Sequence, residues 1–207
     1  MTQDTPTISS KSVQSSNLGF GVDVGGSGIK GAVVDLDTGE LVGERIKILT
    51  PQPSTPDSVA ATVAEIADQA GWSGPVGVTL PSVLMGGVVR TAANIDSSWI
   101  GTDAHELFTG ALGRQDVSIL NDADAAGIAE DRFGAAKDTD GVVILLTFGT
   151  GIGSAVLHNG VLLPNTEFGH MEIGGREAEH IAASSVKDKL GLSYKQWARE
   201  VSRVLEH

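Results

Sequence analysis

The sequence lacks cysteine altogether, and aromatic residues make up only 4% of its 207 residues. Without cysteine, disulfide bonds and thiolate metal sites are both excluded, which fits a cytoplasmic location. No apolar run approaches the roughly 18 residues that a membrane-spanning helix needs, and the N-terminus lacks the basic and apolar regions of a signal peptide. We therefore expect a cytoplasmic protein that has no membrane partner.

Lysine and arginine are also scarce, because 14 of them stand against 26 acidic residues and leave a net charge of −12. A nucleic-acid partner would need clustered basic residues to meet its phosphate backbone, and the sequence shows no such cluster. Any anionic phosphate ligand must therefore be held locally, by backbone amides and a few cations. The hydrophobic content of 41% is enough for a real core.

Two stretches of the chain share one plan, in which a strand runs into a glycine turn and leaves as a second strand. They read FGVDVGGSGIKGAVVD at residues 20–35 and VILLTFGTGIGSAVL at residues 143–157. Each copy turns again, at residues 37–39 and 158–160, so each predicts a β-hairpin extended by a third strand. A duplicated unit predicts two lobes built alike, whose glycine turns could face each other across a cleft.

The remaining pattern predicts alternating helices and strands. In the first lobe we expect a strand at residues 41–49, a helix at 58–70, a strand at 76–80, a small hairpin at 84–90, a helix at 102–112 and a strand at 117–120. A helix opening at residues 121–124 and running through 133 follows. After the second copy we expect a polar loop at 164–176 and helices at 178–189 and 193–205. The last helix has an apolar stripe of Trp197, Val201, Val204 and Leu205 that should cover a sheet.

The first glycine turn, Gly26 to Gly31, is a literal GxGxxG. A dinucleotide-binding fingerprint needs a helix after the glycines, whereas a strand follows here, and no GK[ST] follows to make a Walker A loop. One interpretation is a tight hairpin in which the glycines supply positive φ. The other is a phosphate-binding nest of backbone amides, favoured by two equivalent turns, one with Asp23 and Lys30 and the other with Thr147 and Thr150.

Two further positions carry candidate chemistry. Asp122 follows a strand at a helix N-terminus, where it could be a capping residue, as could Asp124, or a general base for a substrate hydroxyl. The loop at residues 166–172 holds two carboxylates and one imidazole, which suit a metal or a polyol, or could simply be solvated. A metal site would prefer more than one histidine, so Glu167 and His170 favour a monosaccharide, with Glu179 as a further acceptor. Trp99 could be a ligand platform but is more often a core residue.

Together these residues resemble the sugar kinases of the ROK (repressor, open reading frame, kinase) family. The resemblance covers about residues 18–205 through DVGGSGIKG, RTAANIDSSWIGT, LNDADAAG, LLTFGTGIGSA and NTEFGHMEIGG. It implies an α/β, two-lobed actin-like ATPase (ribonuclease H-like) fold with duplicated βββαβα lobes. The expected organisation is a disordered leader at 1–17, an N-terminal lobe at 18–121 and a C-terminal lobe at 122–207, truncated so that its sheet is incomplete and prone to association.

The resemblance also implies roles for individual residues. Asp122 is expected to be the catalytic base, and the sugar is expected to contact Asn94, Asn121, Asp122, Glu167, His170 and Glu179. The donor phosphates are expected around Asp23, Gly25, Gly26, Ser27, Lys30, Thr147, Gly149, Thr150 and Gly151. Many ROK kinases carry a cysteine-rich zinc motif after the Gly-His pair. Residues 174–178 stand there in this sequence, so structural zinc is not expected.

The implied activity is transfer of a phosphoryl group to the 6-hydroxyl of glucose by a homodimer, from polyphosphate or from ATP with Mg²⁺. We expect polyphosphate to work at least as well as ATP, because the phosphate turns are present whereas the family's later adenosine motif is not. Whether mannose is accepted stays open. The alternatives are a strictly ATP-dependent glucokinase or glucomannokinase, and a fragment that binds sugar without turnover. A sugar-sensing repressor would need a DNA-binding motif ahead of residue 18, for which residues 1–17 are too few.

Overall fold

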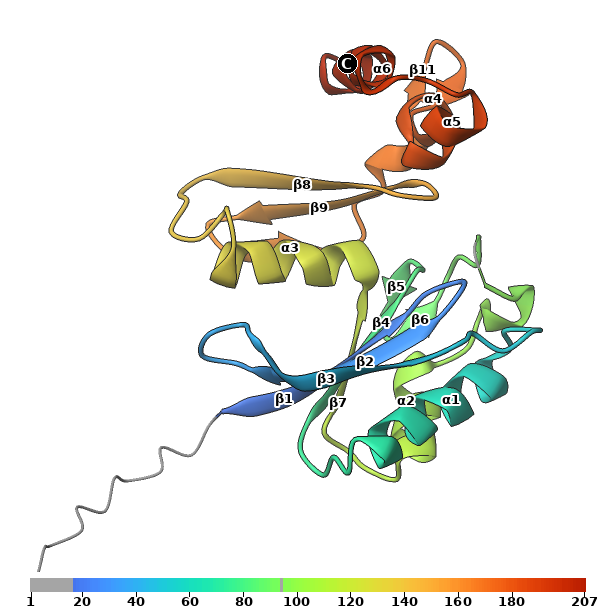
Figure 1. Cartoon of the computed structure of the whole chain (residues 1–207), viewed down its shortest axis with the longest axis vertical. Helices are drawn as coiled ribbons and strands as arrows, with labels where there is room; N and C mark the ends of the chain where they lie inside the picture. Colours follow the sequence, from blue (N-terminus) through green and yellow to red (C-terminus); the bar gives the residue numbers. More distant parts are fainter. Residues whose placement is uncertain (1–16, 94) are drawn as a thin grey trace, which may run out of the picture.

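The computed structural model describes residues 17–93 and 95–207, so the predicted leader up to residue 16 and Asn94 lie outside the described residues. The described chain forms two sheets with helix α3 (Asp122–Phe133) lying between them (Figure 1). No helix in this described part is long and apolar enough to cross a membrane.

The first sheet has five strands in the order β3-β2-β1-β4-β7. Strands β1 (Leu18–Val24), β2 (Ile29–Asp35) and β3 (Leu41–Ile48) are antiparallel, whereas β4 (Val76–Leu80) and β7 (Val117–Asn121) continue the sheet in parallel. Helices α1 (Pro56–Gln69) and α2 (Ala104–Leu112) cover one face (Figure 1). The predicted order of elements in this lobe is therefore confirmed.

Strand β1 separates the core from the face that turns toward α3. Phe20, Val22 and Val24 are at most 2% exposed and belong to one core cluster with residues of α1. Gly21 and Asp23 alternate with them and line a cleft that also includes Ala125 of α3. The alternation thus packs the apolar face of β1 against α1 and α2 and leaves its other, polar face toward the second lobe.

A short hairpin of β5 (Leu84–Met85) and β6 (Val88–Val89) and the 3₁₀ turn η1 (Ser97–Trp99) follow β4. Trp99 is fully buried, its ring lies 6.1 Å from that of Phe108, and its indole N–H donates to the carbonyl of Ser54 at 2.8 Å. Trp99 is therefore a core residue and not a ligand platform.

The second sheet has three strands in the order β10-β9-β8. Strands β8 (Val142–Phe148), β9 (Ile152–His158) and β10 (Val161–Leu163) are antiparallel, as β1 to β3 are. The duplication is thus confirmed, and in the described residues the second sheet has no counterparts of β4 and β7. Helix α3 packs against β9, where Gly127 leaves room for Ala155.

Positive φ explains the outer turns but not the glycine turns. Asn159 and Gly160 have φ values of 50° and 75°, which suit the hairpin between β9 and β10. None of Gly25, Gly26 and Gly28 is among the residues of positive φ, so that interpretation of the first turn is wrong. At Gly28 a Cβ would lie 2.8 Å from Cε of Lys47, the end of a flexible side chain that can move aside.

The region after β10 is more ordered than a polar loop. It contains the 3₁₀ turn η2 (Phe168–His170) and a small hairpin of β11 (Glu172–Ile173) and β12 (Arg176–Glu177), with Gly174 and Gly175 at φ values of 61° and 78°. The single helix predicted at 178–189 is also wrong. It is broken at Ala183, whose ψ of 152° separates α4 (Glu179–Ala182) from α5 (Ser184–Lys189).

Helix α6 (Tyr194–Leu205) begins at Ser193 with a capping box that pairs it with Gln196. Its apolar stripe packs against α4 and the end of β8 instead of covering a sheet face. The indole N–H of Trp197 donates to Ala182 at 2.8 Å, and its ring meets that of Phe148 edge-on at 5.8 Å. Val204 is buried, whereas Leu205 is 62% exposed and does not belong to the stripe.

Candidate functional site

The start of α3 holds the candidate catalytic carboxylate. The capping residue is Asn121, whose Oδ1 accepts from the backbone N–H groups of Ala123 and Asp124 at 2.9 and 3.1 Å. Its Nδ2 donates to the carbonyl of Ser82 at 3.2 Å. The cap is therefore neither Asp122 nor Asp124, and Asn121 fixes the position of Asp122. The direct contact of Asn121 with sugar stays a prediction.

Asp122 is exposed to solvent at the start of α3, although neighbouring protein atoms partly desolvate its carboxylate. One carboxylate oxygen accepts from the N–H of Ala123 at 2.9 Å. Partial burial raises the pKa of Asp122, and the charges of Asp23 and Asp124 raise it further, against the lowering effect of the Ala123 hydrogen bond. A carboxylate with a raised pKa in a cleft is a candidate general base.

Asp124 and Asn165 join the two lobes, and the sequence analysis missed Asn165. Asp124 is 2% exposed and accepts from the N–H of Asn165 at 2.9 Å, while its other oxygen has no partner among the described residues. The side chain of Asn165 accepts from the N–H of Leu84 at 2.9 Å and donates to the carbonyl of Leu84 at 2.7 Å. Asn165 thus ties the loop after β10 to α3 and to β5 at once.

The loop that carries Glu167 is anchored on β9. The hydroxyl of Ser154 donates to the carbonyl of Thr166 at 2.5 Å and accepts from the N–H of Phe168 at 3.0 Å. Glu167 between them is half-buried. Burial raises the pKa of Glu167, the charge of His170 lowers it, and the charges of Asp122, Asp124 and Glu179 raise it. Glu167 is therefore close enough to Asp122, Asp124 and Glu179 for their charges to act on it.

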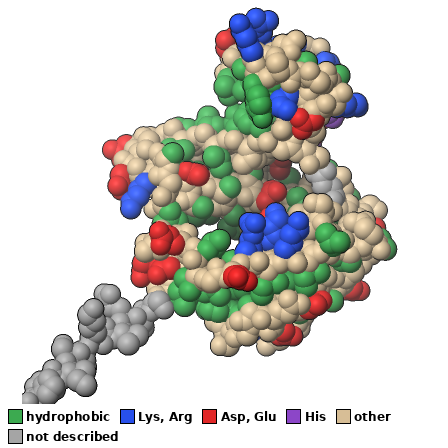
Figure 2. Space-filling model, in the orientation of Figure 1, with side chains coloured by type: hydrophobic (Ala, Val, Ile, Leu, Met, Phe, Trp, Pro, Cys, Tyr) green, Lys and Arg blue, Asp and Glu red, His purple; other side chains and the backbone are tan. Residues whose placement is uncertain are grey.

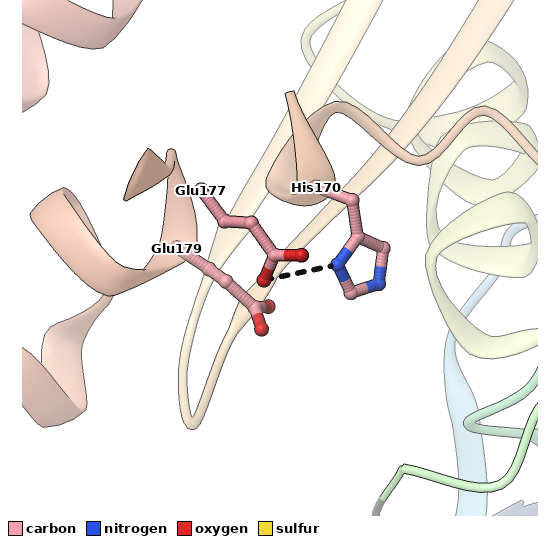
Figure 3. A group of neighbouring side chains, drawn as sticks. All are labelled: His170, Glu177 and Glu179. Atoms are coloured by element: carbon pink, nitrogen blue, oxygen red, sulfur yellow. Dashed lines mark ion pairs between the residues drawn. The ribbon is translucent and has the colours of Figure 1, made fainter. Parts of the chain in front are cut away.

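His170, Glu177 and Glu179 form a second group at the edge of this cleft (Figure 3). One ligand atom from each lies within 4.8 Å of the others, and His170 Nδ1 lies 3.5 Å from Glu177 Oε2. Their imidazole and carboxylate groups could hold a divalent metal or the hydroxyls of a sugar. The sequence analysis missed Glu177, which reaches His170 only because the hairpin of β11 and β12 folds it back.

The first glycine turn closes with a hydrogen bond from the N–H of Gly25 to the carbonyl of Gly28 at 3.2 Å. Beside it, Asp23 accepts from Lys30 Nζ at 3.3 Å and from the hydroxyl of Thr79 at 3.2 Å. Gly26 and Ser27 are exposed at the tip. The turn therefore presents its exposed backbone, with the Lys30 ammonium group beside it. Lys30 pairs with Asp23, the carboxylate whose charge raises the pKa of Asp122.

The second turn is anchored from the C-terminal helices. The N–H of Gly149 donates to the carbonyl of Gly151 at 3.0 Å, and the hydroxyl of Ser185 donates to the carbonyl of Thr150 at 2.6 Å. Thr147 Oγ1 lies over Gly153, where an added Cβ would be 2.6 Å from it and 3.0 Å from Cβ of Ala123. Strand β9, which leaves the second glycine turn, therefore contacts the N-terminus of α3, where backbone N–H groups favour a bound anion.

Known proteins share this architecture. The polyphosphate glucokinase of Mycobacterium tuberculosis is 66% identical over 187 residues, which cover 90% of this chain and 71% of that enzyme. The crystal structure of the inorganic polyphosphate/ATP-glucomannokinase from Arthrobacter sp. strain KM matches with a TM-score of 0.85 at 46% identity, covering 91% of this chain and 77% of that one.

A ROK family glucokinase from Streptomyces griseus, solved in complex with glucose and AMPPNP, matches with a TM-score of 0.73 at 27% identity. The match covers 83% of this chain and 59% of that one. These structural relatives confirm the predicted actin-like ATPase fold. The ROK family model itself matches residues 19–184, and the chain belongs to the ROK family.

Proposed function

We propose that this protein transfers a phosphoryl group from polyphosphate, or from ATP, to the 6-hydroxyl of glucose. The observation that carries the proposal is the position of Asp122, which follows the Asn121 cap at the start of α3 and whose carboxylate interacts electrostatically with Asp23, beside the first glycine turn, and with Glu167. The polyphosphate glucokinase from M. tuberculosis and the glucomannokinase from Arthrobacter, described above, support this choice of reaction.

In the proposed reaction Asp122 orients the sugar hydroxyl and accepts its proton as the oxygen attacks the terminal phosphorus. The phosphoanhydride P–O bond breaks, and the shortened polyphosphate or ADP leaves with its electron pair. A general base of this kind contributes roughly 10²- to 10⁴-fold to a rate. Its raised pKa makes the carboxylate a better proton acceptor than an ordinary aspartate. The rest of the catalysis is positioning and charge neutralisation.

Glu167, His170 and Glu179 are the proposed sugar ligands. Ionised carboxylates accept hydrogen bonds from hydroxyl groups, and an imidazole nitrogen can accept or donate. The similarity to the Arthrobacter enzyme, a glucomannokinase, supports mannose as a second acceptor sugar. Asn94 is proposed as a further ligand by resemblance alone, since it lies outside the described residues.

The donor phosphates are proposed to lie between the two turns, near Gly25, Gly26, Ser27 and Lys30 on one side and Thr147, Gly149, Thr150 and Gly151 on the other. Mg²⁺ prefers hard oxygen ligands, and the carboxylates of Asp23 and Asp122, close enough for one charge to shift the pKa of the other, fit that preference. When bound there, the metal would neutralise donor charge.

A coupled assay for glucose 6-phosphate, with ATP and polyphosphate supplied in parallel, tests the reaction and the donor. Product from polyphosphate at a rate at least equal to that from ATP is expected. If only ATP gives product, the protein is a strictly ATP-dependent glucokinase. If glucose binds but neither donor gives product, the chain is a sugar-binding fragment. The homodimer, the cytoplasmic location and the lobe boundary between residues 121 and 122 remain proposals, of which sedimentation equilibrium tests the first.

A further inference from the structure

The first sheet carries a row of polar side chains that runs from the candidate site to the sheet edge. Asp23 of β1 pairs with Thr79 of β4 on one side and with Lys30 of β2 on the other. Lys30 in turn pairs with Lys47 of β3. Residues directly opposite each other in a sheet point to the same face, so the row shares one face of the sheet, and Asp23, Lys30 and Thr79 of this row line the cleft.

Two lysines opposite each other on neighbouring strands repel, because their Cα atoms lie only about 4.5 to 5.5 Å apart. Asp23 partly neutralises Lys30 at 3.3 Å. Lys47 forms no ion pair with any of the described residues, and its side chain lies over Gly28 of the first turn, with Cε 2.8 Å from where a Cβ would be. A bound anion would offset the repulsion of this like-charge pair.

Arg45 extends the row. It lies two residues before Lys47 on β3, hence on the same face, and it lines a cleft of about 360 Å³ together with Asp23 and Lys30. Within the described residues Arg45 is likewise free of ion pairs. Figure 2 shows Lys and Arg side chains gathered where the first lobe faces the second. In a chain with only 14 basic residues, three on one face beside the phosphate turn form a distinct cationic surface.

We propose that Lys30, Lys47 and Arg45 form a cationic strip that binds the distal phosphates of a linear polyphosphate. This inference rests on the proposed function, in which the terminal phosphate lies beside Asp122. A strip that leads from Asp23 to β3, the edge strand of the sheet, lets a polymer leave the cleft into solvent. A repeating anion uses successive cations, whereas a nucleotide presents only its few phosphates.

Lysines on edge strands also prevent edge-to-edge aggregation, so a binding experiment must separate that role from recognition. The test compares the double variant Lys47→Gln/Arg45→Gln with Lys195→Gln/Arg199→Gln, which removes the same two charges from exposed positions on α6. The probe is a fluorescently labelled long linear polyphosphate, with unlabelled tripolyphosphate and ATP as short competitors.

The strip variant should bind long polyphosphate at least about tenfold more weakly, because charge-assisted phosphate contacts are lost. The slope of log Kd against log salt should fall by about two, one for each cation. Affinity for tripolyphosphate and ATP should change by less than about twofold, and the α6 variant should resemble the unaltered chain. Equal weakening in both variants, or for long and short donors alike, would overturn the inference.

The two proposals fail separately. Binding of long polyphosphate through the strip without formation of glucose 6-phosphate would sink the proposed reaction and support the strip. Turnover with ATP by a chain that does not bind long polyphosphate would refute the strip and support the proposed phosphoryl transfer to glucose.

Discussion

The substitution Asp122→Asn tests the centre of the mechanism. Asparagine keeps the shape of the side chain but cannot take the proton from the sugar hydroxyl. Turnover should fall by about 10²- to 10⁴-fold, which corresponds to about 2.7 to 5.5 kcal/mol of lost transition-state stabilisation. The affinity for glucose should change much less, because the neutral amide can still accept a hydrogen bond.

Unfolding cannot account for a loss of that size. Removing an acidic group from the first turn of a helix costs about 0.3 to 1 kcal/mol of stability. Removing a partly buried charge repelled by Asp23 and Asp124 works in the opposite direction. The two effects offset each other, so the free energy of unfolding should change by less than about 1 kcal/mol, as checked by urea denaturation.

The matched control is Asp57→Asn, which makes the same change in the first turn of α1 at an exposed position. This variant should lose the same favourable interaction between an acidic side chain and the helix dipole, and it should keep full activity. Steady-state kinetics with saturating glucose and each donor give the comparison. Wild-type turnover by Asp122→Asn, or an equal loss in Asp57→Asn, would remove Asp122 from the chemistry.

Three further outcomes are expected. Glu167→Gln should weaken glucose binding by about 1 to 3 kcal/mol in calorimetry, because it replaces a charged hydrogen-bond acceptor. The control Glu172→Gln, at an exposed position in the same region, should bind glucose normally. Equal affinities of the two variants would indicate that the Glu167 loop is merely solvated. Asn165→Ala should lower the free energy of unfolding by about 2 to 3 kcal/mol, because it loses two hydrogen bonds to Leu84 and places alanine at a φ of 59°. In Asn165→Gly the positive φ causes no strain, so the loss of stability in that variant measures the contribution of the hydrogen bonds alone. The acid limb of kcat/KM should lie above the ordinary pKa of aspartate, because burial raises the pKa of Asp122, and a limb at the ordinary value would contradict this. Because the folded chain then binds a proton that the unfolded chain has lost, this group's contribution to stability should decrease as pH rises from the ordinary pKa through the raised one, which urea titrations across acidic pH can follow.

Much of the fold could be predicted because its signals are local. The alternation in β1 marks a strand with one buried face, and the two glycine turns reveal the duplication before any contact is known. The helix at residue 122 follows a strand end and carries its own cap in Asn121. The choice of cap could not be made from spacing, because Asn121, Asp122 and Asp124 could each fill that role, and only the backbone decides which side chain faces the free N–H groups.

The misses share a different cause, since each depends on contacts between distant segments. Asn165 makes its hydrogen bonds to Leu84, 81 residues away in the sequence, and a Pro-Asn pair alone indicates only a turn. Glu177 reaches His170 through a two-strand hairpin too short to show a period. The break at Ala183 lies in a run of good helix formers, and the bond from the N–H of Ser185 to Gly149 shows that docking on the second glycine turn overrides that propensity.

The cleft gathers features that work against folding. Asp23, Asp122, Asp124, Glu167 and Glu179 bring five carboxylates within electrostatic reach of one another, and burial raises the pKa of three of them. Asp124 leaves one buried oxygen without a partner among the described residues. On the opposite side of the cleft, Lys30 faces Lys47 across two strands. Each arrangement costs stability when the cleft is empty, and each is relieved by one class of ligand: hydroxyl donors and a divalent cation for the carboxylates, phosphates for the lysines. Under the proposed function, the sugar lies beside the Glu167 loop and the donor phosphates lie between the two glycine turns, so that Asp122 stands where the hydroxyl and the terminal phosphate meet.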